Sequence, residues 1–194
     1  MDDELDLTGG REGLRAWLAV NAATASGHWL VRYRKGQPGY IPMRDITEDL
    51  LCFGWIDSAV RKRDALSSWL RISPRNPDSA WSGLNKRLVA KARASRRMTP
   101  AGEALIRAAK ANGMWSFLDD VEALVVPGDL ADAMGIGTEA RRNWDAFPPS
   151  SRRGILEWIK QAKREDTRAR RVAETARLAA RNIRALSPEA RAAR

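Results

Sequence analysis

Residues 52–85 hold the side chains of this 194-residue chain that are best suited to binding a ligand. Asp57 follows Trp55 by two positions, so in a strand both side chains would lie on one face. Arg71 and Arg75 come next, and the planar guanidinium fork of arginine suits a carboxylate or a phosphate. We therefore expect a buried Asp57 to pair with Arg71 or Arg75.

Two neutral hydrogen-bonding residues complete this cluster. Ser82 and Asn85 are three positions apart, which places them on one face of a helix. Together with the tryptophans and charges they predict an anion-suited ligand site that consists of Trp55, Asp57, Arg71, Arg75, Trp81, Ser82 and Asn85. The alternative is a structural cluster of ion pairs, in which the acid and the arginines bind one another and no ligand.

The sequence holds no complete catalytic or metal-binding motif. His28 and Cys52 are the single histidine and cysteine, too few for a zinc site of those ligands. No glycine-rich phosphate loop or nucleophile motif occurs. We expect neither a metal nor a cofactor. An enzyme that uses Asp57 as a general acid or base stays an alternative, although pairing would lower the pKa of Asp57 and make it a poor base.

The positive charge is concentrated at the C-terminal end. The whole chain carries +10, and residues 141–194 hold 15 Lys and Arg against 6 Asp and Glu. Such an excess favours an acidic partner, such as nucleic acid, anionic lipid or an acidic protein. The expected polyanion-binding ridge consists of Arg168, Arg170, Arg171, Arg177, Arg181 and Arg184. Binding there would be weak, insensitive to base sequence and steeply salt-dependent, and the alternative is a merely solvated helix surface.

Hydrophobic patterns predict an α+β fold, with a small antiparallel sheet and flanking helices followed by an all-helical module. We expect the α+β module over 1–116 and the arginine-rich helical module over 117–194. Alternation predicts strands at 28–34, 55–61 and 68–72. Helices are expected at 10–24, at 43–53, after a cap at Ser79, from Thr99-Pro100 to about residue 112, at 129–134, at 139–146, from Pro148, and from Asp166 or Thr167 to Leu186.

The chain is expected to lie in the cytoplasm. Its first residues are acidic, unlike the basic start of a signal peptide. No apolar run approaches the roughly 20 residues that span a bilayer.

Several motifs resemble those of the YdeI/OmpD-associated family. They are Cys52–Asp57 (CFGWID), Ser73–Arg75 (SPR), Ser79–Asn85 (SAWSGLN), Met98–Gly102 (MTPAG) and the arginine-rich run Ala162–Arg171. The resemblance covers about residues 11–186, and the N-terminal part is similar to small YjbR/CyaY-type modules.

The resemblance implies a bacterial cytoplasmic protein linked to protection against bacteriocins or other antimicrobial stress. It implies no reaction, cofactor or catalytic residue. We therefore favour a ligand-binding or regulatory module, with an unknown small anionic ligand or acidic partner. The alternatives are non-specific nucleic-acid binding by the C-terminal helices and an enzyme of unknown reaction.

Overall fold

The computed structural model describes residues 4–6 and 9–193, and the chain divides into two compact units, Met1–Phe117 and Leu118–Arg194. The first unit contains a sheet with flanking helices and the second contains helices, which confirms the predicted α+β class. None of the helices in the described ranges is both long enough and apolar enough to cross a lipid bilayer.

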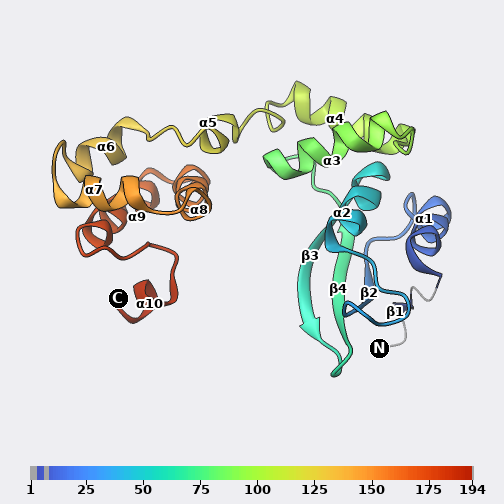
Figure 1. The fold of residues 1–194 in the computed structure, drawn as a ribbon. Helices are drawn as coiled ribbons and strands as arrows, with labels where there is room; N and C mark the ends of the chain where they lie inside the picture. Colours follow the sequence, from blue (N-terminus) through green and yellow to red (C-terminus); the bar gives the residue numbers. More distant parts are fainter. Residues whose placement is uncertain (1–3, 7–8, 194) are drawn as a thin grey trace. The chain divides into compact units, whose positions relative to one another are not determined.

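A four-stranded sheet of order β1-β2-β4-β3 forms the centre of the N-terminal unit (Figure 1). β2 and β3 both run antiparallel to β4, as the sequence predicts. A short edge strand that the sequence analysis did not predict adds parallel to β2. The strands are β1 (Glu4–Asp6), β2 (His28–Tyr33), β3 (Trp55–Lys62) and β4 (Ser67–Pro74).

One face of the sheet forms the larger hydrophobic core of this unit. Leu30 and Leu70 are partners in the β2–β4 register, and both are fully buried. Leucines of two helices pack on them, Leu14 and Leu18 from one and Leu50 from the other. These helices are α1 (Gly10–Asn21) and α2 (Met43–Cys52). Because strand residues alternate between faces, the neighbours of the core residues point to the opposite side of the sheet.

A second hydrophobic cluster forms where α3 (Gly83–Ala94) and α4 (Pro100–Ala111) meet α2. The start of α4 is tied to the end of α2, because the hydroxyl of Thr99 donates a 2.6 Å hydrogen bond to the carbonyl of Cys52. Thr99 also caps α4, as the Thr99-Pro100 pair predicts.

The start of α3 differs from the prediction. The helix begins after Ser82, not after Ser79, and Leu84 in its first turn is 50% exposed. The backbone N–H of Trp81 donates to the carbonyl of Met114, so the chain is held in a non-helical path up to Ser82. The stripe that α3 does bury contains Leu88, Val89 and Ala92.

The C-terminal unit consists of helices, among which α9 packs against three others, α6, α7 and α8. The residues that it buries are Val172, Thr175, Ala176, Leu178 and Ala179. The helix ends at Ala179, earlier than predicted, because Asn182 adopts the left-handed conformation that stops a helix. The helices are α5 (Asp119–Glu122), α6 (Gly128–Met134), α7 (Glu139–Ala146), α8 (Pro149–Lys160), α9 (Glu165–Ala179) and α10 (Pro188–Ala192).

Candidate functional site

The face of the sheet opposite the core carries two tryptophans and two arginines. Trp29 is the partner of Arg71 in the β2–β4 register, and Trp69 is the partner of Arg61 in the β3–β4 register. Register partners share a face, as do residues two apart in a strand. We refer to this side of the sheet, formed by Trp29, Arg61, Trp69 and Arg71, as the outer face.

Two guanidinium groups of the outer face lie over one indole ring. The Cζ atom of Arg61 is 4.8 Å from the centre of the Trp29 ring, and the Cζ atom of Arg71 is 5.8 Å from it. Arg71 lies directly beside Trp29 on the neighbouring strand, whereas Arg61 reaches it diagonally across β4. Both distances fall within the range of about 6 Å at which a cation is attracted to an aromatic face.

The charges of these two arginines are not neutralised by an ion pair. Within the described parts of the chain, neither guanidinium has a carboxylate partner or a hydrogen-bond acceptor. Glu4, the register partner of Trp29 in β1, instead accepts hydrogen bonds from Arg63 at 3.0 Å and from the Trp69 indole at 2.6 Å. These two bonds lower the pKa of Glu4. The outer face therefore retains positive charge that an anionic ligand could use.

Gly27 leaves the space that the Arg71 side chain occupies. A Cβ atom built on Gly27 would lie 2.6 Å from Nη2 of Arg71, and the φ angle of Gly27 is +149°. Residues with a side chain rarely adopt that angle. The glycine before β2 thus positions Arg71 on the outer face.

Arg75 contacts Trp81, although it does not form the expected ion pair. The Cζ atom of Arg75 is 4.4 Å from the centre of the Trp81 ring, and its Nη2 donates a 2.6 Å hydrogen bond to the carbonyl of Ala80. The side chain is buried, and its Nε has no partner among the described residues. Burial lowers the pKa of this guanidinium, and the charge of Asp57 opposes the shift. These contacts hold the loop before Trp81 in place, so Arg75 has a structural role.

The expected pairing of Asp57 with Arg71 is wrong, because the two residues lie on opposite faces of the sheet. Asp57 is the register partner of Ile72, a core residue, and so lies on the core side together with Trp55, as the alternation predicts. Its carboxylate accepts a 3.2 Å hydrogen bond from Thr47. Asp57 is only half-buried, not largely buried as expected.

The structure distributes the remaining predicted site residues over different places. Trp55 belongs to the core cluster of the sheet, where its indole N–H donates to the carbonyl of Ala22. Trp81 belongs to the second cluster, next to Trp115 at a ring distance of 5.1 Å. Ser82 caps α3, and its hydroxyl accepts from the backbone N–H of Asn85. Trp55 and Trp81 therefore belong to two separate hydrophobic clusters.

A buried acidic pair is a feature that the sequence analysis missed. The carboxylates of Glu48 and Asp49 in α2 are fully buried, and four basic residues contact them. Asp49 alone accepts hydrogen bonds from three arginines, at 2.5 to 3.2 Å. The four basic residues are Arg11, Arg15, Lys91 and Arg97. Two adjacent acids directly before the apolar residues Leu50–Cys52 were the signal for this network, which ties α1, α3 and the following loop to α2.

His28 and Cys52 have packing roles in the N-terminal unit. The ring of His28 lies 4.9 Å from that of Trp17, which in turn packs edge-on against Trp55. Cys52 is buried at the end of α2. Burial raises the pKa of its thiol, and Arg15 opposes the shift, so a reactive thiolate is disfavoured.

Two of the six arginines predicted to form the C-terminal ridge are engaged in contacts within the C-terminal unit. Arg168 forms a bidentate ion pair with Asp129 of α6, at 2.8 and 3.0 Å. Arg171 donates to the carbonyl of Trp158 and lies over the Trp158 ring. The six arginines are therefore not equivalent, because α6 and α8 supply partners for these two that the sequence pattern does not show.

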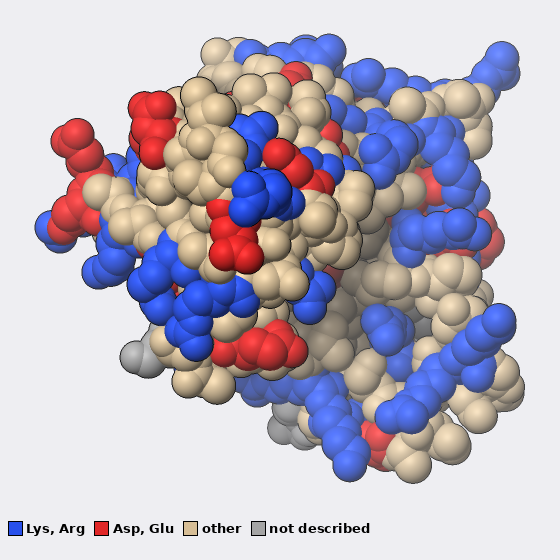
Figure 2. All heavy atoms as spheres, turned by 60° about the vertical axis from the view of Figure 1, so that its left-hand side comes forward, with Lys and Arg blue, Asp and Glu red and all other residues tan. Residues whose placement is uncertain are grey.

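The other four arginines of the ridge are exposed and form no ion pair within the described residues. Because α9 ends at Ala179, they do not form one helical row. Figure 2 shows Lys and Arg side chains in several groups on the visible face, with Asp and Glu side chains between them. The four are Arg170, Arg177, Arg181 and Arg184.

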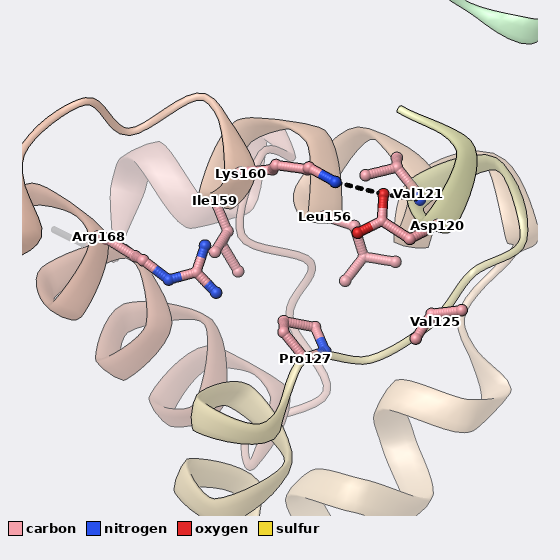
Figure 3. Close-up of a pocket in the computed structure, with 8 residues that line it drawn as sticks. All are labelled: Asp120, Val121, Val125, Pro127, Leu156, Ile159, Lys160 and Arg168. Carbon is pink, nitrogen blue, oxygen red and sulfur yellow. Dashed lines mark hydrogen bonds and ion pairs between the residues drawn. The ribbon is translucent and has the colours of Figure 1, made fainter. Parts of the chain in front are cut away.

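The C-terminal unit also has a small cavity of about 110 Å³, drawn in Figure 3. Leu156 and Ile159 form part of its apolar lining. Lys160 is paired at its rim with Asp120 at 2.5 Å, and Arg168 is paired with Asp129. These ion pairs fasten α5 and α6 to α8 and α9, so the cavity offers no uncompensated charge. No group of three or more metal-ligating side chains is found in residues 4–6 and 9–193.

Comparisons with known proteins match two different family models to the two units of the chain. Residues 8–105 match the family model described as "Domain of unknown function (DUF8412)". Residues 123–182 match the one described as "Bacteriocin-protection, YdeI or OmpD-Associated". The second match confirms the YdeI/OmpD-associated resemblance for that segment, whereas the YjbR/CyaY-type resemblance of the N-terminal part gains no support. No curated protein and no solved structure matches the chain.

Proposed function

We propose that this chain, which belongs to the family described as "Domain of unknown function (DUF8412)", binds anions through its N-terminal unit. The observation that carries the proposal is the position of Arg61 and Arg71 over Trp29, without a carboxylate partner among the described residues. A guanidinium group offers several N–H donors in a planar fork that matches phosphate and carboxylate oxygens.

The site differs from the one expected from the sequence. It keeps Arg71 and replaces Asp57, Arg75 and the other expected residues with Trp29 and Arg61. Arg75 is left out of the proposed site because its buried guanidinium already donates to the carbonyl groups of Ser79 and Ala80. Asp57 is left out of the proposed site because its carboxylate lies on the core side of the sheet, where it accepts a hydrogen bond from Thr47 and its charge acts on the pKa of Arg75.

A match of residues 123–182 to a bacteriocin-protection family model supports a physiological setting in protection against such toxins. We place the module in the cytoplasm, where a lone thiol such as Cys52 stays reduced. Loss of protection in cells that carry Arg61→Gln and Arg71→Gln would connect the site with this setting.

The direct test is binding of linear polyphosphate to the full chain, measured by calorimetry at low and moderate salt. We expect the double variant Arg61→Gln/Arg71→Gln to bind more weakly and with a shallower salt dependence, because each lost phosphate contact reduces the number of counterions released. A double variant Arg170→Gln/Arg177→Gln removes the same charge from the C-terminal unit and serves as the control. Equal weakening by both pairs would show general electrostatics instead of a site.

A second candidate function is weak polyanion binding by the C-terminal unit. The four exposed and unpaired arginines, Arg170, Arg177, Arg181 and Arg184, favour it. If they govern binding, their replacement by glutamine will abolish polyphosphate binding, while Arg61→Gln/Arg71→Gln will have no effect.

A further inference from the structure

We infer that the outer face binds single-stranded nucleic acid, with a base stacked at Trp29 and backbone phosphates held by Arg61 and Arg71. This inference rests on the proposed anion-binding function and names its ligand. It goes beyond that function because it requires the aromatic ring as well as the charges.

Aromatic rings and cations are combined on one face of the sheet. Trp29 and Trp69 lie on adjacent strands, both half-buried, and both point away from the core. Proteins that bind single strands combine a positively charged surface with aromatic side chains on which bases stack. A guanidinium plane offers a second stacking surface. The layer formed by Trp29 and Arg61 can therefore contact a base and a phosphate together.

A single strand fits this surface better than a duplex. In a duplex the base faces are stacked inside, so a ring on a sheet surface cannot reach them. Unpaired bases can be splayed onto aromatic side chains. The outer face should therefore prefer a single strand to a duplex of the same sequence.

The outer face differs from the C-terminal arginines in carrying aromatic rings. Residues 159–194 contain no Phe, Trp or Tyr, so the exposed arginines there can contact phosphates but cannot stack bases. A preference for strands that carry bases would thus point to the N-terminal unit.

The test uses the full chain and fluorescence anisotropy with three probes. These are a thymidine homopolymer about 12 nucleotides long, within the usual range of single-strand site sizes, an abasic sugar–phosphate strand of the same length, and a duplex of the same length. We expect the homopolymer to bind most tightly. Trp29→Leu should weaken homopolymer binding by about tenfold or more, as loss of one stacked base does, and leave abasic-strand binding within about twofold.

Two variants keep the test specific. Trp29→Phe retains an aromatic ring and should recover most of the homopolymer affinity. Trp115→Leu changes a tryptophan that also lies beside cations, Lys86 and Lys110, but belongs to the second cluster. It should bind the homopolymer as the unmodified chain does. An equal effect of Trp29→Leu and Trp115→Leu would overturn the inference.

The outcomes separate this inference from the proposed function. If Arg61→Gln/Arg71→Gln weakens binding of every probe while Trp29→Leu changes none, anion binding stands and base stacking is refuted. If Arg61→Gln/Arg71→Gln changes no affinity, both fail. If both hold, the double variant should also reduce the slope of log affinity against log salt by about 1.4, or about 0.7 for each phosphate contact.

Discussion

The guanidinium of Arg75 lies against the indole of Trp81, with its Cζ atom 4.4 Å from the ring centre, while its Nη2 donates to the carbonyl of Ala80. The cation and the ring come from the two ends of one loop. Arg75 is only 7% exposed, so its methylene groups and its guanidinium group fill space that water would otherwise enter.

Replacement of Arg75 should destabilise the N-terminal unit. Arg75→Met keeps most of the packing but cannot donate to the carbonyl groups of Ser79 and Ala80, which should cost about 1–3 kcal/mol. Arg75→Ala should cost more, because it also removes the contact with Trp81. Urea unfolding followed by tryptophan fluorescence measures both. A methionine variant more stable than the original chain would show that the burial of the charge outweighs its hydrogen bonds.

Loss of the buried carboxylate of Asp49 should be more damaging. Asp49→Ala leaves Arg11, Arg15 and Arg97 without their shared partner, and breaking a buried pair costs about 3–5 kcal/mol. Glu12→Ala is the matched control, because Glu12 also pairs with Arg97 but its side chain is 76% exposed. It should cost less than about 1 kcal/mol. Similar losses from both substitutions would contradict the structural role given to the buried pair.

Gly102 should not tolerate a side chain. A Cβ atom there would lie 2.4 Å from the carbonyl oxygen of Cys52 and 2.7 Å from that of Leu51, both backbone atoms that cannot easily move. Gly102→Ala should therefore destabilise by about 1–3 kcal/mol, in line with overpacking elsewhere. Gly128→Ala, at the start of α6 with no atom within 4 Å of its Cβ, should change stability little. Thermal unfolding of the two variants decides between these expectations.

Cys52 should react slowly with thiol reagents in the folded protein. Burial raises the pKa of its thiol above the ordinary value of 9.0. The neutral form therefore adds stability below the unfolded pKa, and this contribution is lost as the pH rises through the folded pKa. Colour development with Ellman's reagent at pH 8 should be slow in buffer and fast in urea. Equal rates would mean that the thiol is accessible in the folded chain.

Local patterns predicted most elements of the N-terminal unit. Alternation placed the strands 55–61 and 68–72 within one or two residues of β3 and β4. The Thr99-Pro100 pair identified the start of α4, because capping depends on neighbouring residues alone. The three-residue β1 is too short to show alternation, and its pairing with β2 depends on the rest of the fold.

The candidate site could not be predicted because it depends on strand order and register. Asp57 and Arg71 both carry suitable charge, yet the β3–β4 register places them on opposite faces. Arg61 reaches Trp29 only because β4 lies between their strands. In the same way, the partner that neutralises Arg168 comes from α6, 39 residues away in the sequence.

Anion binding at Arg61 and Arg71 beside Trp29 can be followed by NMR of the tryptophan indole N–H signals during a polyphosphate titration. Eight tryptophans give eight such signals, and single Trp→Phe variants assign them. If anions bind there, the Trp29 signal should shift in proportion to the bound fraction, while the signal of Trp144, in the core of the C-terminal unit, should not move. A Trp29 signal that stays in place while amide signals near Arg177 and Arg181 shift would contradict it.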